Sequence, residues 1–526
     1  MQAAEAADEV RADAQQAPEF GRPGVRPFEE LAVFGEFRPL APPRLLATLR
    51  RRLHLRGGDR ARGLLGSSLL HARELSKGRA ALFLLLLLLL AAPALPRQAE
   101  RAATQRFPNV VILTIDTLRA DHVSAYGYRR PTTPNIDRLL AGGVRFTEAR
   151  TVEPLTNPAL ASMLTSLYPH EHGATRNGLK MRPGLPSVAR ALTRRGYESA
   201  AFVSNWPLKD RISGLAEHFG RYDEVFTRKR WLGLFKDEAT AADLTDAALA
   251  WLAEARQGRR PFLLWVHYVE PHAPYRLHEE LVRPLGLPQR GERSRLDRYD
   301  TEIAFADSHL GRLLAAFDRD PELKANTLFV FAADHGESLG EHGYWGHGRN
   351  LYEPTLRIPL GMAWAGKIRP GTTVDAPALN LDVAPTILGL AGLPIPSSFE
   401  GFDWTPVLQN GAPPPRDRVL WFEAHKGAVL SSQEAANARR KGLLEVGVMV
   451  NGRKQILRLA EGGLSLFDLA QDPRETRGLA ADAQLSRRLQ EWMGTVQKEL
   501  IASDRLAPAE VGSEDVAQLR ALGYLQ

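Results

Sequence analysis

Acidic and imidazole side chains follow apolar runs of this sequence at the points where the runs end. Asp116 comes directly after the run 109–115, and Asp334 and His335 follow the run 327–332. If these runs are parallel strands, their carboxyl ends meet at one edge of the sheet, where α/β proteins bind ligands. Carboxylate oxygens and imidazole nitrogens suit a divalent cation such as Zn, Mn, Mg or Ca. The pattern therefore predicts a metal-binding site at this edge.

Two further histidines follow a third apolar run, 261–266. His267 comes directly after it, and His272 lies in the segment 270–274, which reads EPHAP. Imidazole groups transfer protons near neutral pH or bind metals, so both are candidates for the same site. A loop histidine that is only packed against its neighbours is the alternative for His272.

The apolar runs have the composition of strands that are buried on both faces of a sheet. They are short, rich in β-branched or aromatic residues, and lack polar alternation. Helical patterns separate them along the chain, and this alternation favours an α/β sandwich around a mostly parallel sheet. The expected strands are 109–115, 199–204, 261–266 and 327–332, and the expected helices are 135–141, 185–195, 238–256 and 296–317.

A small α+β subdomain is expected at the C-terminal end. The Pro-rich segment 412–415 reads APPP and is typical of a linker, so we expect a catalytic domain over 107–410 and a subdomain over 416–526. The turn Asn451-Gly452 predicts a hairpin between two of its strands. The expected strands are 419–423, 446–450 and 454–459, followed by a helix over 482–500.

An unbroken apolar run, 80–95, sets the expected compartment. A basic stretch precedes it, and the positive-inside rule then places residues 1–79, which we expect to be largely disordered, in the cytoplasm. We expect residues 80–96 to anchor a single-pass membrane protein whose catalytic domain is periplasmic or extracellular. The alternative is a cleaved signal peptide, which also exports the catalytic part.

Composition excludes several classes of function. The net charge is +7, but many of the basic residues precede residue 80 and no aromatic interleaving or recognition motif accompanies them, so no nucleic-acid partner is expected. The chain has no cysteine, which rules out disulfides, thiolate zinc sites and a cysteine nucleophile.

Seven segments, in the same order along the chain, resemble the characteristic blocks of the sulfatase family. The resemblance extends over residues 107–526 and implies an alkaline-phosphatase/sulfatase-like sandwich around a mostly parallel sheet. It also implies a sulfuric or phosphoric ester hydrolase of the alkaline-phosphatase superfamily. The segments are 109–122, 134–139, 161–170, 299–313, 333–343, 351–359 and 466–480.

The sequence departs from the family pattern at four positions. Sulfatases carry Cys or Ser followed by x-Pro-x-Arg, and convert the first residue to formylglycine; here Thr156 and Leu160 take the first and last places. Thr117 replaces an aspartate that is a probable calcium ligand, and His347 replaces a substrate-binding lysine. Threonine nucleophiles occur in phosphoryl-transferring relatives, so the departures favour phosphoryl-type chemistry.

The resemblance assigns roles to particular residues. One divalent ion (Zn, Mn, Ca or Mg) would be held by Asp116, Asp334, His335 and the oxygen of Thr156. Thr156 would be a metal-activated nucleophile. The remaining histidines would face the transferred group or hold a second ion, and an ordinary helix N-cap is the alternative for Thr156. These histidines are His272 and His347, with His267 as a further candidate.

Three functions remain open from the sequence. The first is a metal-dependent hydrolase of a sulfate or phosphate ester on a glycan, lipid or small molecule. The second is a transferase of phosphoethanolamine-type head groups between lipids or glycans. The third is an inactive sulfatase fold that serves as a binding protein. The segments 221–235 and 277–298 are expected to shape the substrate pocket, and Arg119 is expected either to contact an anion or to face solvent.

Overall fold

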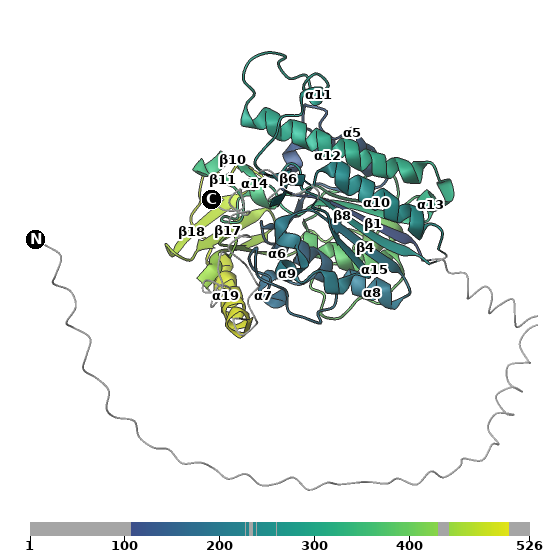
Figure 1. Ribbon diagram of the computed structural model, residues 1–526. Coiled ribbons are helices and arrows are strands. Elements are labelled where there is room, and N and C mark those ends of the chain that lie inside the picture. The colour runs from purple at the N-terminus through teal and green to yellow at the C-terminus, as the bar shows by residue number, and fades with distance from the viewer. Residues whose placement is uncertain are drawn as a thin grey trace, which may run out of the picture. The chain divides into compact units, whose positions relative to one another are not determined.

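An eight-stranded sheet forms the centre of the protein (Figure 1). The computed structural model describes residues 107–226, 228–230, 235–237, 239–258, 260–429 and 441–503. The strand order is β13-β2-β12-β9-β1-β8-β4-β5, and only β12 runs antiparallel to its neighbours. The strands are β1 (Asn109–Ile115), β2 (Val144–Phe146), β4 (Glu198–Val203), β5 (Arg221–Glu224), β8 (Phe262–Tyr268), β9 (Thr327–Ala333), β12 (Leu360–Ala363) and β13 (Thr372–Val374).

Helices cover both faces of this sheet, as Figure 1 shows. Every residue of β1, β8 and β9 is buried, which explains why these strands are mostly apolar. The expected α/β sandwich around a mostly parallel sheet is confirmed. One face carries α5 (Pro134–Ala141), α10 (Ala241–Ala255) and α12 (Arg295–Asp318), and the other carries α6 (Thr156–Thr165), α8 (Val188–Arg194) and α15 (Val383–Leu390).

Strand β8 is longer than the sequence predicts. It continues through His267 to Tyr268, because parallel pairing with β1 continues opposite Thr114 and Ile115. His267 is therefore part of the sheet and is held by strands on both sides, since it also pairs with Val203 of β4. The rigid sheet, and not a loop, fixes the direction of this imidazole.

A second, four-stranded antiparallel sheet lies near the C-terminal end, and α19 packs against it. The expected hairpin joins β16 to β17 through Asn451 and Gly452, whose φ angles of 52° and 75° fit a type I′ turn. Strand β18 was not expected from the sequence. The elements are β15 (Leu420–His425), β16 (Leu443–Val450), β17 (Arg453–Arg458), β18 (Gly463–Asp468) and α19 (Ala483–Ser503).

A buried ionic cluster joins the second sheet to the main body. The ammonium group of Lys454 on β17 lies 2.8 Å from Glu353 and 2.7 Å from Glu475. Glu353 also binds the guanidinium of Arg150 at 2.8 Å. Burial alone would raise the pKa of Glu353, but the charges of Arg150 and Lys454 hold it well below its ordinary value. Glu353 is therefore compensated, whereas burial raises the pKa of Glu475, which shares the ammonium group of Lys454.

The same sheet also binds the segment directly before α6. The amide of Glu423 on β15 donates to the carbonyl of Val152 at 2.9 Å. His425 contacts the carboxylate of Glu153 through its backbone amide at 3.0 Å and through Nδ1 at 2.9 Å. The start of α6 is thus positioned in part by a strand near the other end of the chain.

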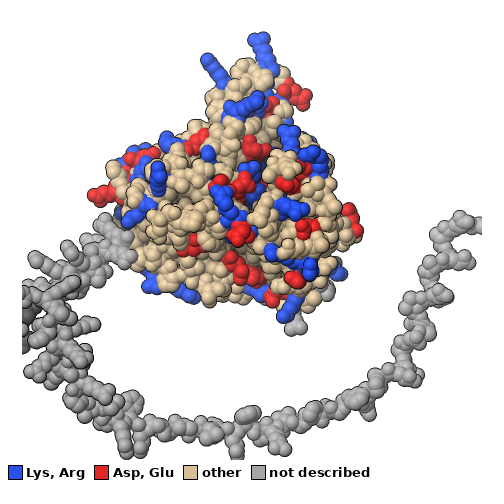
Figure 2. All heavy atoms as spheres, turned by 180° about the vertical axis from the view of Figure 1, so that it is seen from behind, with Lys and Arg blue, Asp and Glu red and all other residues tan. Residues whose placement is uncertain are grey.

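The expected disordered segment 1–79 and membrane segment 80–96 lie outside the described residues. Within the part of the chain that the structure describes, no helix has both the length and the apolar composition to span a bilayer. Figure 2 shows that acidic and basic side chains are intermixed over the face drawn there.

Candidate active site

Three buried donor groups converge at the carboxyl ends of neighbouring strands. Asp116 follows β1, His267 is the penultimate residue of β8, and Asp334 follows β9. One ligand atom of each lies within 4.8 Å of the others. Because β1 is the strand between β9 and β8, the topology alone brings these side chains together, as the sequence predicts for the two aspartates.

His335 faces the same cluster with an unprotonated nitrogen. Its Nδ1–H donates to the carbonyl of Gly336 at 2.8 Å. Its Nε2 lies 3.6 Å from Oδ1 of Asp116 and 3.5 Å from Oδ2 of Asp334. Burial lowers the pKa of His335 well below its ordinary value, so the ring is neutral. A lone pair directed at two carboxylates is an arrangement that a cation stabilises.

His267 presents a second such nitrogen. Burial lowers its pKa to about 3, so this ring is neutral as well. Its Nδ1 lies 2.8 Å from Oγ1 of Thr114, which also accepts the indole N–H of Trp265 at 2.9 Å. Neither Nε2 of His267 nor Oδ2 of Asp334 has a hydrogen-bond partner among the residues described by the structure. This donor set fits a divalent cation.

The carboxylates are oriented by polar groups around them. Asn205 donates to Oδ2 of Asp116. The amide of Thr117 donates to Oδ1 of Asp334 at 3.1 Å. Burial raises the pKa of Asp334 to about 7, and a bound cation would displace that proton. The sequence did not identify Asn205, although it directly follows the expected strand 199–204.

Thr156 is the first residue of α6, and its hydroxyl faces the cluster. Oγ1 lies 3.4 Å from Nε2 of His335. The helix N-cap is Leu155, and no side chain caps this end, so the interpretation of Thr156 as the N-cap is wrong. Leu160, at the place of the sulfatase arginine, is buried in the apolar core one turn further on. Near Thr156 the helix therefore offers a hydroxyl but no guanidinium.

Two more histidines lie next to this cluster. The ring of His347 is 4.5 Å from that of His335 and 5.3 Å from that of His272, measured between centroids. Nδ1 of His347 lies 3.1 Å from Oε1 of Glu337, and the hydroxyl of Tyr275 donates to Oε2 of the same carboxylate at 3.2 Å. Glu337 thus fixes the orientation of His347.

His272 is buried and neutral. Its Nδ1–H donates to the carbonyl of Ala273 at 2.7 Å. Its pKa is lowered to about 3, first by burial and then by the neighbouring His347. The loop therefore fixes the ring of His272 beside that of His347.

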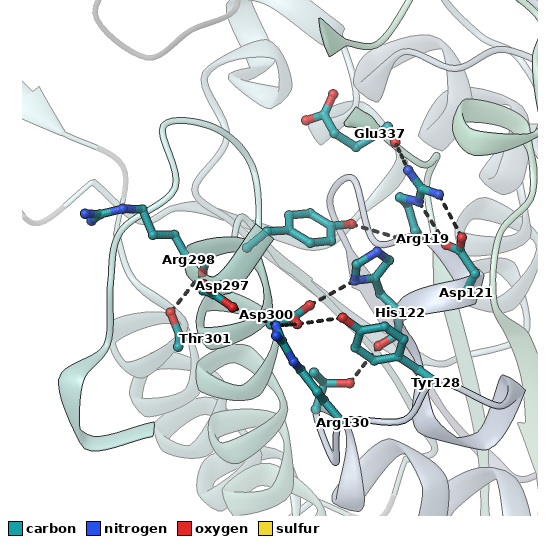
Figure 3. Close-up of polar contacts among 12 residues, drawn as sticks. Arg119, Asp121, His122, Tyr128, Arg130, Asp297, Arg298, Asp300, Thr301 and Glu337 are labelled. Atoms are coloured by element: carbon teal, nitrogen blue, oxygen red, sulfur yellow. Dashed lines mark hydrogen bonds and ion pairs between the residues drawn. The ribbon is translucent and has the colours of Figure 1, made fainter. Parts of the chain in front are cut away.

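Arg119 is neither solvated nor open to an anion. It is buried, and its guanidinium binds Asp121 at 2.7 Å and the carbonyl of Glu337 at 3.2 Å (Figure 3). The same guanidinium also binds Glu341 at 2.7 Å. Burial alone would lower its pKa, but the hydrogen bond and charge of Asp121 and the charge of Glu341 raise it above its ordinary value. Arg119 thus supports the loop after Asp334.

A second polar cluster holds α12 against the loop after β1. Asp300 contacts Nδ1 of His122 at 2.9 Å and accepts hydrogen bonds from Tyr128 and Arg130, each at 2.6 Å (Figure 3). These three contacts all come from residues of that loop. The cluster fixes the N-terminal half of α12 beside the site.

This fold and this site define a sulfatase-family hydrolase of the alkaline-phosphatase superfamily. The model of the Sulfatase family matches residues 108–393, and a model described as N-sulphoglucosamine sulphohydrolase, C-terminal, matches residues 340–502. Because the first match covers more than half of the chain, the chain belongs to the sulfatase family.

Individual relatives are distant but cover most of the chain. The chain is 25% identical to an N-acetylglucosamine-6-O-sulfatase of Bacteroides thetaiotaomicron, over 78% of this chain and 90% of that protein. It resembles a solved structure in complex with its substrate D-glucosamine-2-N,6-O-disulfate, with a TM-score of 0.61, 21% identity, and coverage of 76% and 100%. It also resembles a phosphonate monoester hydrolase from Silicibacter pomeroyi, with a TM-score of 0.56, 22% identity, and coverage of 75% and 96%.

Proposed function

We propose that this sulfatase-family hydrolase cleaves a sulfate or phosphate ester with the hydroxyl of Thr156 as nucleophile. The observation that carries the proposal is the distance of 3.4 Å between Oγ1 of Thr156 and Nε2 of His335, at the edge of a buried donor cluster. A threonine hydroxyl is a weak nucleophile at its free pKa and needs activation.

The donor cluster would supply that activation by holding a divalent cation. Asp116, His267, Asp334 and His335 are the residues that would bind it, with Oγ1 of Thr156 beside them. Such a cation would favour loss of the hydroxyl proton and offset the charge of an anionic ester.

The other steps fall to side chains of the protein. Thr156 would form a covalent ester with the transferred group while the bond to the leaving oxygen breaks, and water would then hydrolyse that ester. His347, oriented by Glu337, would give a proton to the leaving oxygen and accept one from water. His272 would face the transferred group as a neutral imidazole.

Thr156 and Leu160 favour a phosphate ester over a sulfate ester. Formylglycine cannot form from threonine, and Leu160, a residue of the apolar core, stands where sulfatases carry the arginine that holds the aldehyde hydrate. The structural likeness to a phosphonate monoester hydrolase is compatible with this choice. The family and the curated sulfatases favour sulfate, so both ester classes belong in the test.

The proposed test is hydrolysis by the purified full chain with each of the four candidate metals. The substrates are 4-nitrophenyl sulfate, 4-nitrophenyl phosphate and bis(4-nitrophenyl) phosphate, with the bound metal measured on the same samples. Metal-dependent hydrolysis of any of them supports the proposal. Absence of both turnover and bound metal would instead support the inactive binding protein.

We also propose that the catalytic domain acts outside the cytoplasm, anchored through residues 80–96. The support is the apolar run 80–95 with its basic flank on the N-terminal side. A reporter that is active only outside the cytoplasm, fused after Gln526, should be active. Activity of a cytoplasm-only reporter at the same position would contradict the proposal.

A further inference from the structure

A pocket of about 420 Å³ adjoins the candidate active site. Its lining includes Ala273 and Gly346, the residues next to His272 and His347 in the chain, and Glu337, which binds His347. The pocket and the site therefore share a wall. Its volume falls in the range of ligand-binding pockets, about 300–1,000 Å³.

Two arginines from the first turn of α12 line this pocket. Arg298 is half-buried, and within the described ranges its guanidinium makes no hydrogen bond or ion pair. Figure 3 shows its side chain pointing away from the cluster around Asp300. Among the described residues, the guanidinium of Arg295 makes no hydrogen bond or ion pair either, and its carbon lies 4.9 Å from the centroid of the Trp345 ring. Both guanidinium groups thus keep their hydrogen-bond donors for a ligand.

Not every arginine of this region keeps its guanidinium donors free, as Arg119 shows. All three guanidinium nitrogens of Arg119 are bound to protein oxygens. The one carboxylate in the pocket wall, Glu337, accepts hydrogen bonds from Tyr275 and His347. The charge that the pocket offers to a ligand is therefore positive.

Aromatic faces form another part of the wall. Trp345 is 42% exposed although it belongs to a short strand, β11 (Trp345–Gly346), which pairs with β10 (Ser338–Leu339). Tyr275 lines the pocket as well, held by its bond to Glu337. Exposed aromatic surface beside unpaired guanidinium groups fits a ring with one apolar face, such as the C–H face of a sugar, that carries an anionic group.

We infer that this pocket binds a second anionic group of the substrate, a sulfate or carboxylate on the sugar residue that carries the cleaved ester or on its neighbour. The inference rests on the proposed function, because it places the ester at Thr156 and the second group between Arg295 and Arg298. It narrows the substrate class to a polyanionic glycan. The guanidinium groups of Arg295 and Arg298 can each make two hydrogen bonds to an anionic group. The protein should therefore bind a ligand with two anionic groups at least tenfold more tightly than a ligand with one.

The test compares inhibition by a sugar with two anionic groups and by a sugar with one. D-glucosamine-2-N,6-O-disulfate and D-glucosamine-6-sulfate are added to the metal-loaded full chain during hydrolysis of the best chromogenic ester. The ratio of their inhibition constants measures the selectivity. The wild-type protein should prefer the disulfated sugar. In the double variant R295A/R298A, the ratio of the inhibition constants should fall at least tenfold. Arg298→Lys should keep part of it, because the charge remains but the bidentate geometry is lost.

Arg283→Ala is the matched control, since this arginine is exposed and lies outside the pocket; it should leave the ratio as in the wild type. A wild-type protein without preference, or a double variant with the wild-type ratio and melting temperature, would overturn the inference. If no ester is hydrolysed, the proposed function fails. Calorimetric binding of the two sugars to the same variants then tests the pocket independently.

Discussion

The hydroxyl of Thr114 lies 2.8 Å from Nδ1 of His267, between two residues that are paired across β1 and β8. The Thr114 hydroxyl is placed to donate to the carbonyl of Val266 at 3.5 Å, so its oxygen is left to accept from the indole N–H of Trp265 and from Nδ1 of His267. We therefore assign the imidazole proton to Nδ1 and the lone pair to Nε2, which faces Asp116 and Asp334. A threonine that makes no direct contact with the proposed cation would thus decide whether His267 can bind it.

Replacing this threonine should therefore weaken metal binding. Thr114→Val removes the oxygen that fixes the ring, and metal affinity should fall by about 10- to 100-fold. Thr114→Ser keeps the oxygen and should stay close to the wild type. Affinity is measured by titration calorimetry of metal-free protein. His267→Ala should have a larger effect, whereas His218→Ala, a buried histidine bound to Ser187, should have none. Equal affinities of the Val and Ser variants would contradict the assignment.

Removal of the Thr156 hydroxyl should abolish turnover without unfolding the protein. Thr156→Val keeps the shape of the side chain, and the hydroxyl does not cap α6, so the melting temperature should change little. The rate should fall by orders of magnitude, as expected when a nucleophile is lost. Thr156→Ser should retain part of the activity. Turnover and melting temperature are measured on the same samples.

Thr165→Val is the matched control for this variant. Thr165 lies at the other end of α6, where its hydroxyl donates to the carbonyl of Ala161 at 2.7 Å. It should cost some stability but leave turnover per folded molecule unchanged. A stable Thr156→Val protein with near-normal turnover would end the nucleophile hypothesis.

Stability should depend on pH through Glu270. Burial, and then the charge of Glu302, raises the pKa of Glu270 from 4.5 to about 7. The native state therefore holds this proton more tightly than the unfolded chain, so stability falls as pH rises from about 4.5 through about 7. Glu270→Gln stays neutral and should reduce this fall by at most about 3 kcal/mol.

Urea unfolding at pH 4.5 and pH 7.5 measures the difference for both proteins. The control is Glu279→Gln in the short helix α11 (Glu279–Val282), where the side chain is exposed. A steeper pH dependence in the Glu270 variant than in the wild type would contradict the sign of this prediction.

Lys454 should be far more important for stability than a surface lysine. Lys454→Met leaves Glu353 and Glu475 with less compensation in a buried position, which should cost about 3–5 kcal/mol. Lys324→Met removes an exposed pair with Asp318 and should cost no more than about 1 kcal/mol. Chemical denaturation measures both, and equal effects would contradict the role of the cluster.

The sequence predicts the central strands of the main sheet well because each of them is marked by an apolar run within a few consecutive residues. The runs that became β1, β4, β8 and β9 are mostly apolar, and the expected bounds differ from the observed ones by no more than two residues at any end. Asp116 and Asp334 could be placed together because they follow strands whose carboxyl ends share one edge. These predictions required only strand length and direction.

The remaining site residues depend on pairing that the sequence does not show. His267 was placed after a strand and turned out to be within one, because the pairing with β1 continues. Asn205 and Glu337 act through carboxylates and imidazoles brought from distant segments. Arg119 was expected either to contact an anion or to face solvent, but Glu341, 222 residues away, binds it. Each outcome depends on tertiary contacts.

The bonds between β15 and the segment before α6 bear on how this protein could be recombined with its relatives. Glu153 and His425 are 272 residues apart, yet they bind each other three residues before Thr156. Exchanging the C-terminal sheet for that of another sulfatase would therefore replace half of a matched pair. The C-terminal region is not an interchangeable module: a chimera should regain activity only when residues 152–153 are taken from the same donor as β15.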